Sequence, residues 1–223
     1  MKTLCASLRI NVLGSKGVGK SAITVRYLTR RFIGEYSSGL DISYQSTFTH
    51  GDTPIKLDLL DVSSQDEYQA VCHDLYDADA FVVVYSVTDK GSFKVAQKEV
   101  EMIRSRTPSE TPILLLGNKL DLEHVRTVPR EEILRVKEAY GCAHTEVSAA
   151  ECPVMIVNGI HALILDAVSS LGHSGRCIKR RRSLFENMSR KLGNVFRRKS
   201  LDEAPVTKKK TFRISHNANR RSV

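Results

Sequence analysis

The sequence predicts an α/β fold: a mostly parallel six-stranded sheet with helices on both faces, followed by a basic C-terminal tail. The short continuous apolar runs at 80–86 and 112–118 are typical of strands buried on both sides. Segments with apolar residues at helical spacing separate the strands, and this alternation favours parallel pairing. A concentration of Lys and Arg after residue 173 marks off the tail.

The expected strands occupy residues 8–13, 43–50, 55–62, 80–86, 112–118 and 143–148. The second and third alternate apolar and polar residues, as half-buried strands do, and the turn GDTP separates them. We expect helices over 20–32, around Phe93 to Ile103, over 130–141 with Gly141 as the stop signal, and from Ile156 to Leu171. This order predicts an N-terminal extension (1–7), one domain (8–172) and a tail (173–223).

The charge is unevenly distributed along the 223 residues. Residues 174–223 contain 16 Lys and Arg against 3 Asp and Glu. The residues before them contain 18 Lys and Arg against 22 Asp and Glu. The five cysteines are scattered without zinc-site spacing, which indicates free thiols in a reducing compartment. Because we find no signal-peptide run and no apolar stretch approaching a membrane span, we expect a cytoplasmic protein.

The stretch GSKGVGKS, Gly14 to Ser21, fits the phosphate-loop pattern G-x-x-x-x-G-K-[ST] between a strand and a helix. Glycines let backbone N–H groups turn toward phosphate oxygens, and the helix N-terminus adds its positive end. In this motif Lys20 reaches the β- and γ-phosphates, and the Ser21 hydroxyl ligates Mg²⁺.

Two further stretches follow buried strands. Asn118, Lys119 and Asp121 come at the end of one strand, and Ser148 and Ala149 end the next. A carboxylate there can accept hydrogen bonds from N1–H and the 2-amino group of guanine, which adenine cannot donate. Either stretch alone is weak evidence because Asn and Asp are common turn residues. In this order after a phosphate loop, they predict guanine recognition.

These motifs and their separations resemble the Ras family of small GTPases over about 165 residues. The stretch VRYLTRRFIGEY and a basic tail without a terminal CaaX box are most similar to the Ras-related oestrogen-regulated growth inhibitor group. The resemblance implies a P-loop small G domain that binds GTP or GDP with Mg²⁺. It assigns Mg²⁺ to Ser21 and Asp61, and the orientation of the attacking water to Gln65. The implied nucleotide contacts are Gly14, Gly17, Val18, Gly19, Lys20, Ser21, Ala22, Phe32, Asn118, Lys119, Asp121, Ser148 and Ala149.

The chain departs from the family pattern where the γ-phosphate is sensed. Ras proteins have Asp-Thr-Ala-Gly-Gln where this chain has Asp61-Val62-Ser63-Ser64-Gln65. The Mg²⁺-binding threonine of the first switch aligns with Gly39. The third residue of the phosphate loop is usually glycine in Ras proteins, and here it is Lys16, which crowds the place where an activating protein inserts its arginine. The alternative interpretation is that the Lys16 side chain simply points into solvent.

We therefore expect a Ras-like guanine-nucleotide-binding signalling protein with degenerate switches and weak GTP hydrolysis. The alternative is a pseudo-GTPase scaffold acting through its surface or its tail. We expect a monomer with effector or regulatory protein partners whose identity the sequence does not give.

The tail contains one amphipathic stretch, at about 183–197. Its apolar face would comprise Leu184, Phe185, Met188, Leu192, Val195 and Phe196. Basic residues surround this face, which predicts binding to calmodulin or to an anionic membrane such as the inner face of the plasma membrane. The remainder is polar and expected to be disordered. A solvated tail or a nuclear localisation signal is the alternative; nucleic-acid binding is not expected because aromatic residues are sparse.

Overall fold

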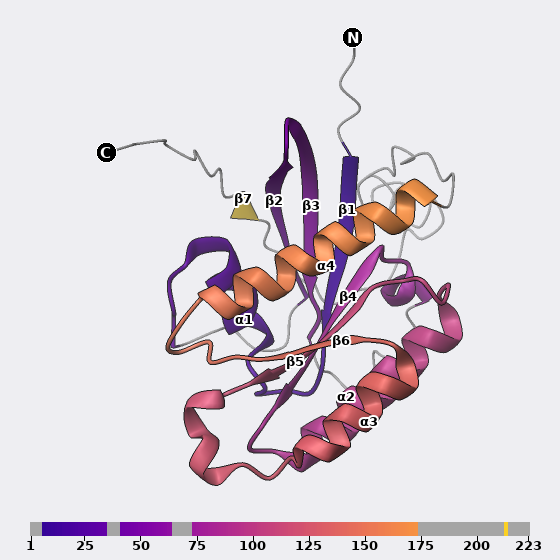
Figure 1. The fold of residues 1–223 in the computed structure, drawn as a ribbon. Coiled ribbons are helices and arrows are strands. Elements are labelled where there is room, and N and C mark those ends of the chain that lie inside the picture. The colour runs from indigo at the N-terminus through magenta and orange to yellow at the C-terminus, as the bar shows by residue number, and fades with distance from the viewer. Residues whose placement is uncertain (1–5, 35–40, 64–72, 174–211, 214–223) are drawn as a thin grey trace, which may run out of the picture.

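The computed structural model describes residues 6–34, 41–63, 73–173 and 212–213. The strands are β1 (Ala6–Leu13), β2 (Ile42–His50), β3 (Thr53–Asp61), β4 (Ala80–Ser86), β5 (Ile113–Asn118), β6 (Ala143–Glu146) and β7 (Phe212–Arg213). The helices are α1 (Lys20–Thr29), α2 (Lys90–Arg106), α3 (Arg130–Tyr140) and α4 (Val154–His173), with two 3₁₀ helices, η1 (His73–Tyr76) and η2 (Leu120–Val125). Figure 1 shows their arrangement.

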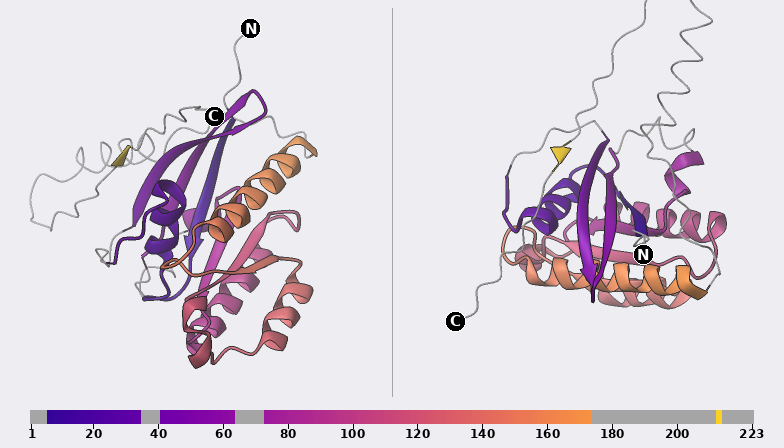
Figure 2. Two further views of the ribbon diagram at one scale, coloured as in Figure 1. Left: turned by 60° about the vertical axis from the view of Figure 1, so that its left-hand side comes forward. Right: turned by 90° about the horizontal axis from the view of Figure 1, so that it is seen from above.

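The strands form one sheet in the order β6-β5-β4-β1-β3-β2-β7. Among the described strands, only β2 and β3 pair antiparallel. These two form the long hairpin visible in both views of Figure 2. All residues of β4 and β5 are buried, as their continuous apolar runs predicted. The α/β class with a mostly parallel sheet is confirmed.

Helices pack on both faces of the sheet, and alternate strand residues point to the two faces. One core contains Val82 and Val84 of β4 with residues of α1 and α4. The other contains Phe81, Val83 and Tyr85 of the same strand with residues of α2 and α3. The sheet is therefore the middle of three layers.

The carboxyl ends of the parallel strands lie along one edge of the sheet. Leu13, Asp61, Ser86, Asn118 and Glu146 are the last residues of β1, β3, β4, β5 and β6. The loops that follow these residues carry the chemical motifs found in the sequence. Ligands of open α/β sheets bind at such an edge, so the fold brings these motifs to one place.

The first helix ends earlier than predicted. We expected it to reach residue 32, but α1 ends at Thr29 because Arg30 adopts a left-handed conformation with φ +62°. Its N–H still bonds to the carbonyl of Arg26 at 2.9 Å, which closes the last turn. Helical periodicity in the sequence did not reveal this stop, since left-handed residues at helix ends are usually glycine.

The tail adds a strand that the sequence did not predict. Phe212 and Arg213 pair in parallel with Tyr44 and Gln45 of β2, although we expected no regular structure in this part of the tail. The amphipathic helix predicted at about 183–197 lies outside the described residues.

The last helix corrects our expectation about membrane-spanning stretches. Residues Val154–Leu171 of α4 are long and apolar enough to cross a membrane by length and composition. However, Ile156, Ile160, Leu163 and Ile164 are buried in the core against the sheet. We therefore interpret α4 as a core helix. Its apolar face is the one that the periodicity of the sequence predicted.

Candidate functional site

The phosphate loop leaves β1 through a position that only glycine fits. Gly14 has φ +133°, and a Cβ on it would lie 2.1 Å from the carbonyl oxygen of Val84 in β4. Gly17 and Gly19 also have positive φ, at +80° and +98°. These three residues turn the loop back toward the start of α1, and Val18 of the same loop is buried. The local geometry is that of an anion-binding loop at a helix N-terminus.

The Lys20 side chain folds back over this loop from the first turn of α1. Its Nζ donates hydrogen bonds to the carbonyl oxygens of Gly14 and Ser15, at 2.8 and 2.9 Å. Burial lowers the pKa of Lys20, while the nearby Asp61 opposes the shift. A buried ammonium among backbone groups at a helix N-terminus is a favourable partner for a phosphate.

Ser21 and Asp61 form the second part of the site. The parallel pairing of β1 and β3 places Asp61 opposite Val12, close to the phosphate loop. The Ser21 hydroxyl donates to the Asp61 carboxylate over 2.5 Å. Burial raises the pKa of Asp61, and the bond from Ser21 and the charge of Lys20 oppose this. A hydroxyl and a carboxylate oxygen in contact fit the oxygen preference of Mg²⁺, so the two residues can hold that ion.

Asn118 connects the phosphate loop to the opposite end of the site. Its Nδ2 donates to the carbonyl of Val18 at 2.9 Å, and its Oδ1 accepts the N–H of Ala149 at 3.0 Å. The side chain is buried, and a Cβ on Gly19 would lie 2.3 Å from its Nδ2. Asn118 therefore fixes two loops that are about 130 residues apart in the chain.

Asp121 and Ser148 meet where the sequence placed base recognition. The Ser148 hydroxyl donates to Asp121 Oδ1 over 2.6 Å and accepts the N–H of Glu151 at 3.2 Å. Lys119 has a left-handed conformation, φ +66°, and directs the chain from β5 into η2. The result is a carboxylate held by a hydroxyl, an arrangement that can accept hydrogen bonds from the donors of a purine base.

Several predicted site residues are less constrained or lie outside the described residues. Phe32 is 45% exposed. Lys16 is exposed, in agreement with the alternative interpretation that its side chain points into solvent. Gln65, the predicted catalytic residue, and Gly39 of the first switch fall in the stretches that the structure does not describe.

Sequence reasoning missed two contacts near the site. Asp41 Oδ1 accepts the N–H of Ser63 at 2.7 Å, which joins the segments next to the two switches. Arg126 bonds to the carboxylate of Glu146 at the end of β6. No periodicity in the sequence signals either contact, because each joins residues on separate segments.

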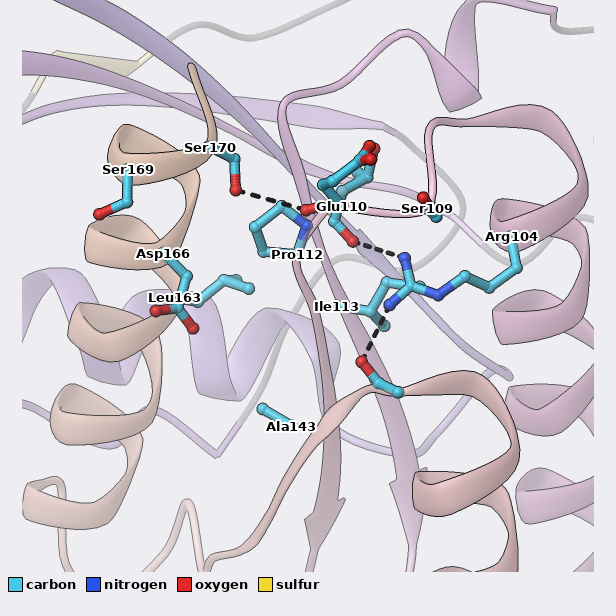
Figure 3. Close-up of a pocket in the computed structure, with 12 residues that line it drawn as sticks. Arg104, Ser109, Glu110, Pro112, Ile113, Ala143, Leu163, Asp166, Ser169 and Ser170 are labelled. Carbon is cyan, nitrogen blue, oxygen red and sulfur yellow. Dashed lines mark hydrogen bonds between the residues drawn. The ribbon is translucent and has the colours of Figure 1, made fainter. Parts of the chain in front are cut away.

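A cavity of about 710 Å³ lies at the other edge of the sheet, where β5 and β6 begin. Figure 3 shows Arg104 on this cavity, where it donates to the carbonyls of Thr111 and Gly141. The same guanidinium also bonds to the carbonyl of Tyr140. The cavity contains none of the predicted site residues.

Known proteins are similar to this chain over the region that contains the site. The family profile described as "Ras family" matches residues 9–166. A Bos taurus protein described as "Ras-related and estrogen-regulated growth inhibitor-like protein" is 35% identical over 204 residues, 87% of this chain and 98% of its own length. The Mus musculus GTP-binding protein Rit1 is 30% identical over 198 residues, 88% and 90% of the two chains. The Homo sapiens Ras-like protein family member 12 is 39% identical over 149 residues, 65% of this chain and 56% of its own.

Proposed function

We propose, because the chain belongs to the Ras family of GTP-binding signalling proteins, that it holds guanine nucleotide while hydrolysing GTP weakly and switching conformation little. One observation carries this proposal. The residues that would hold the nucleotide are assembled in the structure, while the residues that would sense the γ-phosphate are altered in the sequence.

Contacts between four loops support the first part of this proposal, the binding of nucleotide. Lys20 lies on the phosphate loop, Ser21 contacts Asp61, and Asn118 ties the phosphate loop to the loop after β6. In the proposed function Ser21 and Asp61 hold Mg²⁺, which neutralises phosphate charge when it is bound. Asp121 accepts hydrogen bonds from guanine with its carboxylate fixed by Ser148.

The sequence of the two switches supports the second part of the proposal, weak hydrolysis and little conformational switching. Ser64 stands where the family has a glycine whose N–H meets the γ-phosphate, and its Cβ restricts the conformations that aim that N–H. Gly39 has no side chain to ligate Mg²⁺. Gln65 is retained and would still orient water. Since a ligand shifts a conformation only through contacts that differ between states, fewer γ-phosphate contacts give a smaller GTP/GDP contrast.

The tail is the basis of a second proposal, in which the protein acts as a scaffold rather than a switch. The basic amphipathic pattern of 183–197 favours binding to an anionic membrane or to calmodulin. We accordingly propose a cytoplasmic protein, peripheral to the inner face of the plasma membrane and monomeric. Nuclear localisation is the alternative for the same basic residues.

Nucleotide analysis of the purified protein, followed by affinities for GDP and a non-hydrolysable GTP analogue, tests the main proposal. We expect co-purified guanine nucleotide and affinities for the two ligands within about tenfold of each other, with Mg²⁺ strengthening both. Equal affinity for adenine and guanine nucleotides would remove the proposal. A GTP-analogue preference that disappears only when Mg²⁺ is removed would show that the γ-phosphate is still sensed and contradict the impaired switch.

A further inference from the structure

The short helix that carries Asp121 lacks support from the hydrophobic core. None of the six residues of η2, all of which the structure describes, is buried. The helix is also irregular, because Leu122 has φ −99° and ψ +32° in its middle. Isolated helical turns of this length are not stable on their own. Polar contacts must therefore fix the position of Asp121.

Two of these contacts lie at the start of η2. The N–H of Leu120 donates to the carbonyl of Val147 at 3.0 Å. Ser148 donates to Asp121 itself at 2.6 Å. Both come from the segment that follows β6, so the position of that segment determines where the carboxylate lies.

Arg126 provides the contact at the other end of η2. Its Nη1 and Nη2 donate to the two oxygens of Glu146, each at 2.8 Å, in a two-pronged geometry. Its Nε donates to both oxygens of Glu123 at 2.9 Å. The side chains of Arg126 and Glu146 are only 12% and 15% exposed, so water screens this pair less than an ordinary surface pair. Only the planar fork of arginine can engage both carboxylates in this way.

We propose that Arg126 is a positioning residue for guanine recognition, because it ties η2, which carries Asp121, to the end of β6, which leads to Ser148. This inference rests on the proposed guanine-nucleotide binding and adds a residue that touches no nucleotide. Arg126 joins Glu123, two residues after Asp121, to Glu146, two residues before Ser148. Losing it lets the carboxylate move relative to the hydroxyl, which weakens the reading of the base more than the grip on the phosphates.

The test compares GDP with inosine diphosphate, whose base lacks the 2-amino donor. We expect the wild type to prefer GDP by about tenfold or more, as loss of a hydrogen bond to a charged group implies. Arg126→Met should release GDP about tenfold faster and lower the preference to about threefold. Glu146→Gln keeps the side-chain shape and should reproduce the effect. Arg126→Lys keeps the charge without the fork and should restore only part of the preference.

A matched ion pair on the surface is the control. Lys90 and Glu132 lie 2.6 Å apart, join α2 to α3 and are 45% and 34% exposed. Lys90→Met and Glu132→Gln should leave release and preference unchanged. If the Arg126 and Glu146 variants keep the wild-type preference, even with a lower melting temperature, the pair contributes only to stability and the inference is wrong. A wild type that fails to bind GDP, or does not prefer it, removes the proposed guanine binding instead.

Discussion

Replacing Ser148 by alanine removes the hydroxyl that orients Asp121. The hydroxyl donates to Asp121 over 2.6 Å and accepts the N–H of Glu151 at 3.2 Å. Alanine keeps the Cβ but makes neither bond. The carboxylate then loses its fixed orientation toward the base, while the phosphate loop and Lys20 are unchanged. We expect weaker guanine-nucleotide binding with a stable fold.

The magnitude follows from the kind of bond that is lost. A hydrogen bond to a charged group contributes about 1.5–3 kcal/mol. Asp121 is exposed in the structure, so water replaces part of the lost bond and the lower value applies. About 1.5 kcal/mol corresponds to roughly a tenfold change in affinity. Because most affinity changes in related complexes occur in dissociation, GDP release should become about tenfold faster.

The assay is release of a fluorescent GDP derivative into excess unlabelled GDP, followed by stopped-flow fluorescence. Ser170→Ala is the control, because the Ser170 hydroxyl also donates to an oxygen, the Glu110 carbonyl at 3.4 Å, but at the opposite edge of the sheet. Release from Ser148→Ala within about twofold of both the wild type and this control would refute the role given to Ser148.

Three further predictions address stability and the tail. Gly14→Ala should destabilise the protein by about 3 kcal/mol or more in urea unfolding, since its Cβ would meet the backbone of Val84. Gly141→Ala, measured in the same way, should cost about 1 kcal/mol, because Gly141 has φ +57° but lies in open space. Burial lowers the pKa of His144 below its ordinary 6.5, so the unfolded chain binds the proton more tightly and stability is lost as the pH falls below 6.5. His144→Gln should flatten this loss between about pH 7.5 and 5.5, and an unchanged slope would contradict it. Leu192→Glu should reduce flotation of the full chain with phosphatidylserine vesicles, and unchanged flotation would leave only electrostatic attraction.

The sequence was sufficient for the parts of the site that depend on local pattern. The glycines and Lys20 of the phosphate loop have fixed spacing between a strand and a helix, and parallel strands bring their carboxyl ends to one edge. The position of Asn118 and Asp121 relative to the loop follows from these two facts. The continuous apolar runs of β4 and β5 predicted their burial for the same reason, since both faces of the sheet are covered.

The rest depends on contacts between residues far apart in the sequence. The Arg126–Glu146 pair joins residues on different elements, and no periodicity signals such a pair. The left-handed conformation of Arg30 could not be predicted either. The preference for glycine at the end of a helix is statistical, and local hydrogen bonding can override it. The pairing of Phe212 with β2 depends on where the tail runs, which neither composition nor charge determines.

Single-turnover GTP hydrolysis tests the central claim of an intact nucleotide site with a degenerate switch. The wild type is compared with a variant that restores the family residues, Gly39→Thr with Ser64→Gly, each loaded with γ-labelled GTP in the presence of Mg²⁺. We expect a wild-type rate below the order of 10⁻⁴ per second typical of intrinsic Ras hydrolysis, and a clearly faster rate for the restored variant, with Gln65→Leu abolishing the gain. A wild-type rate at or above that value, unchanged by the restoration, would contradict the degenerate switch.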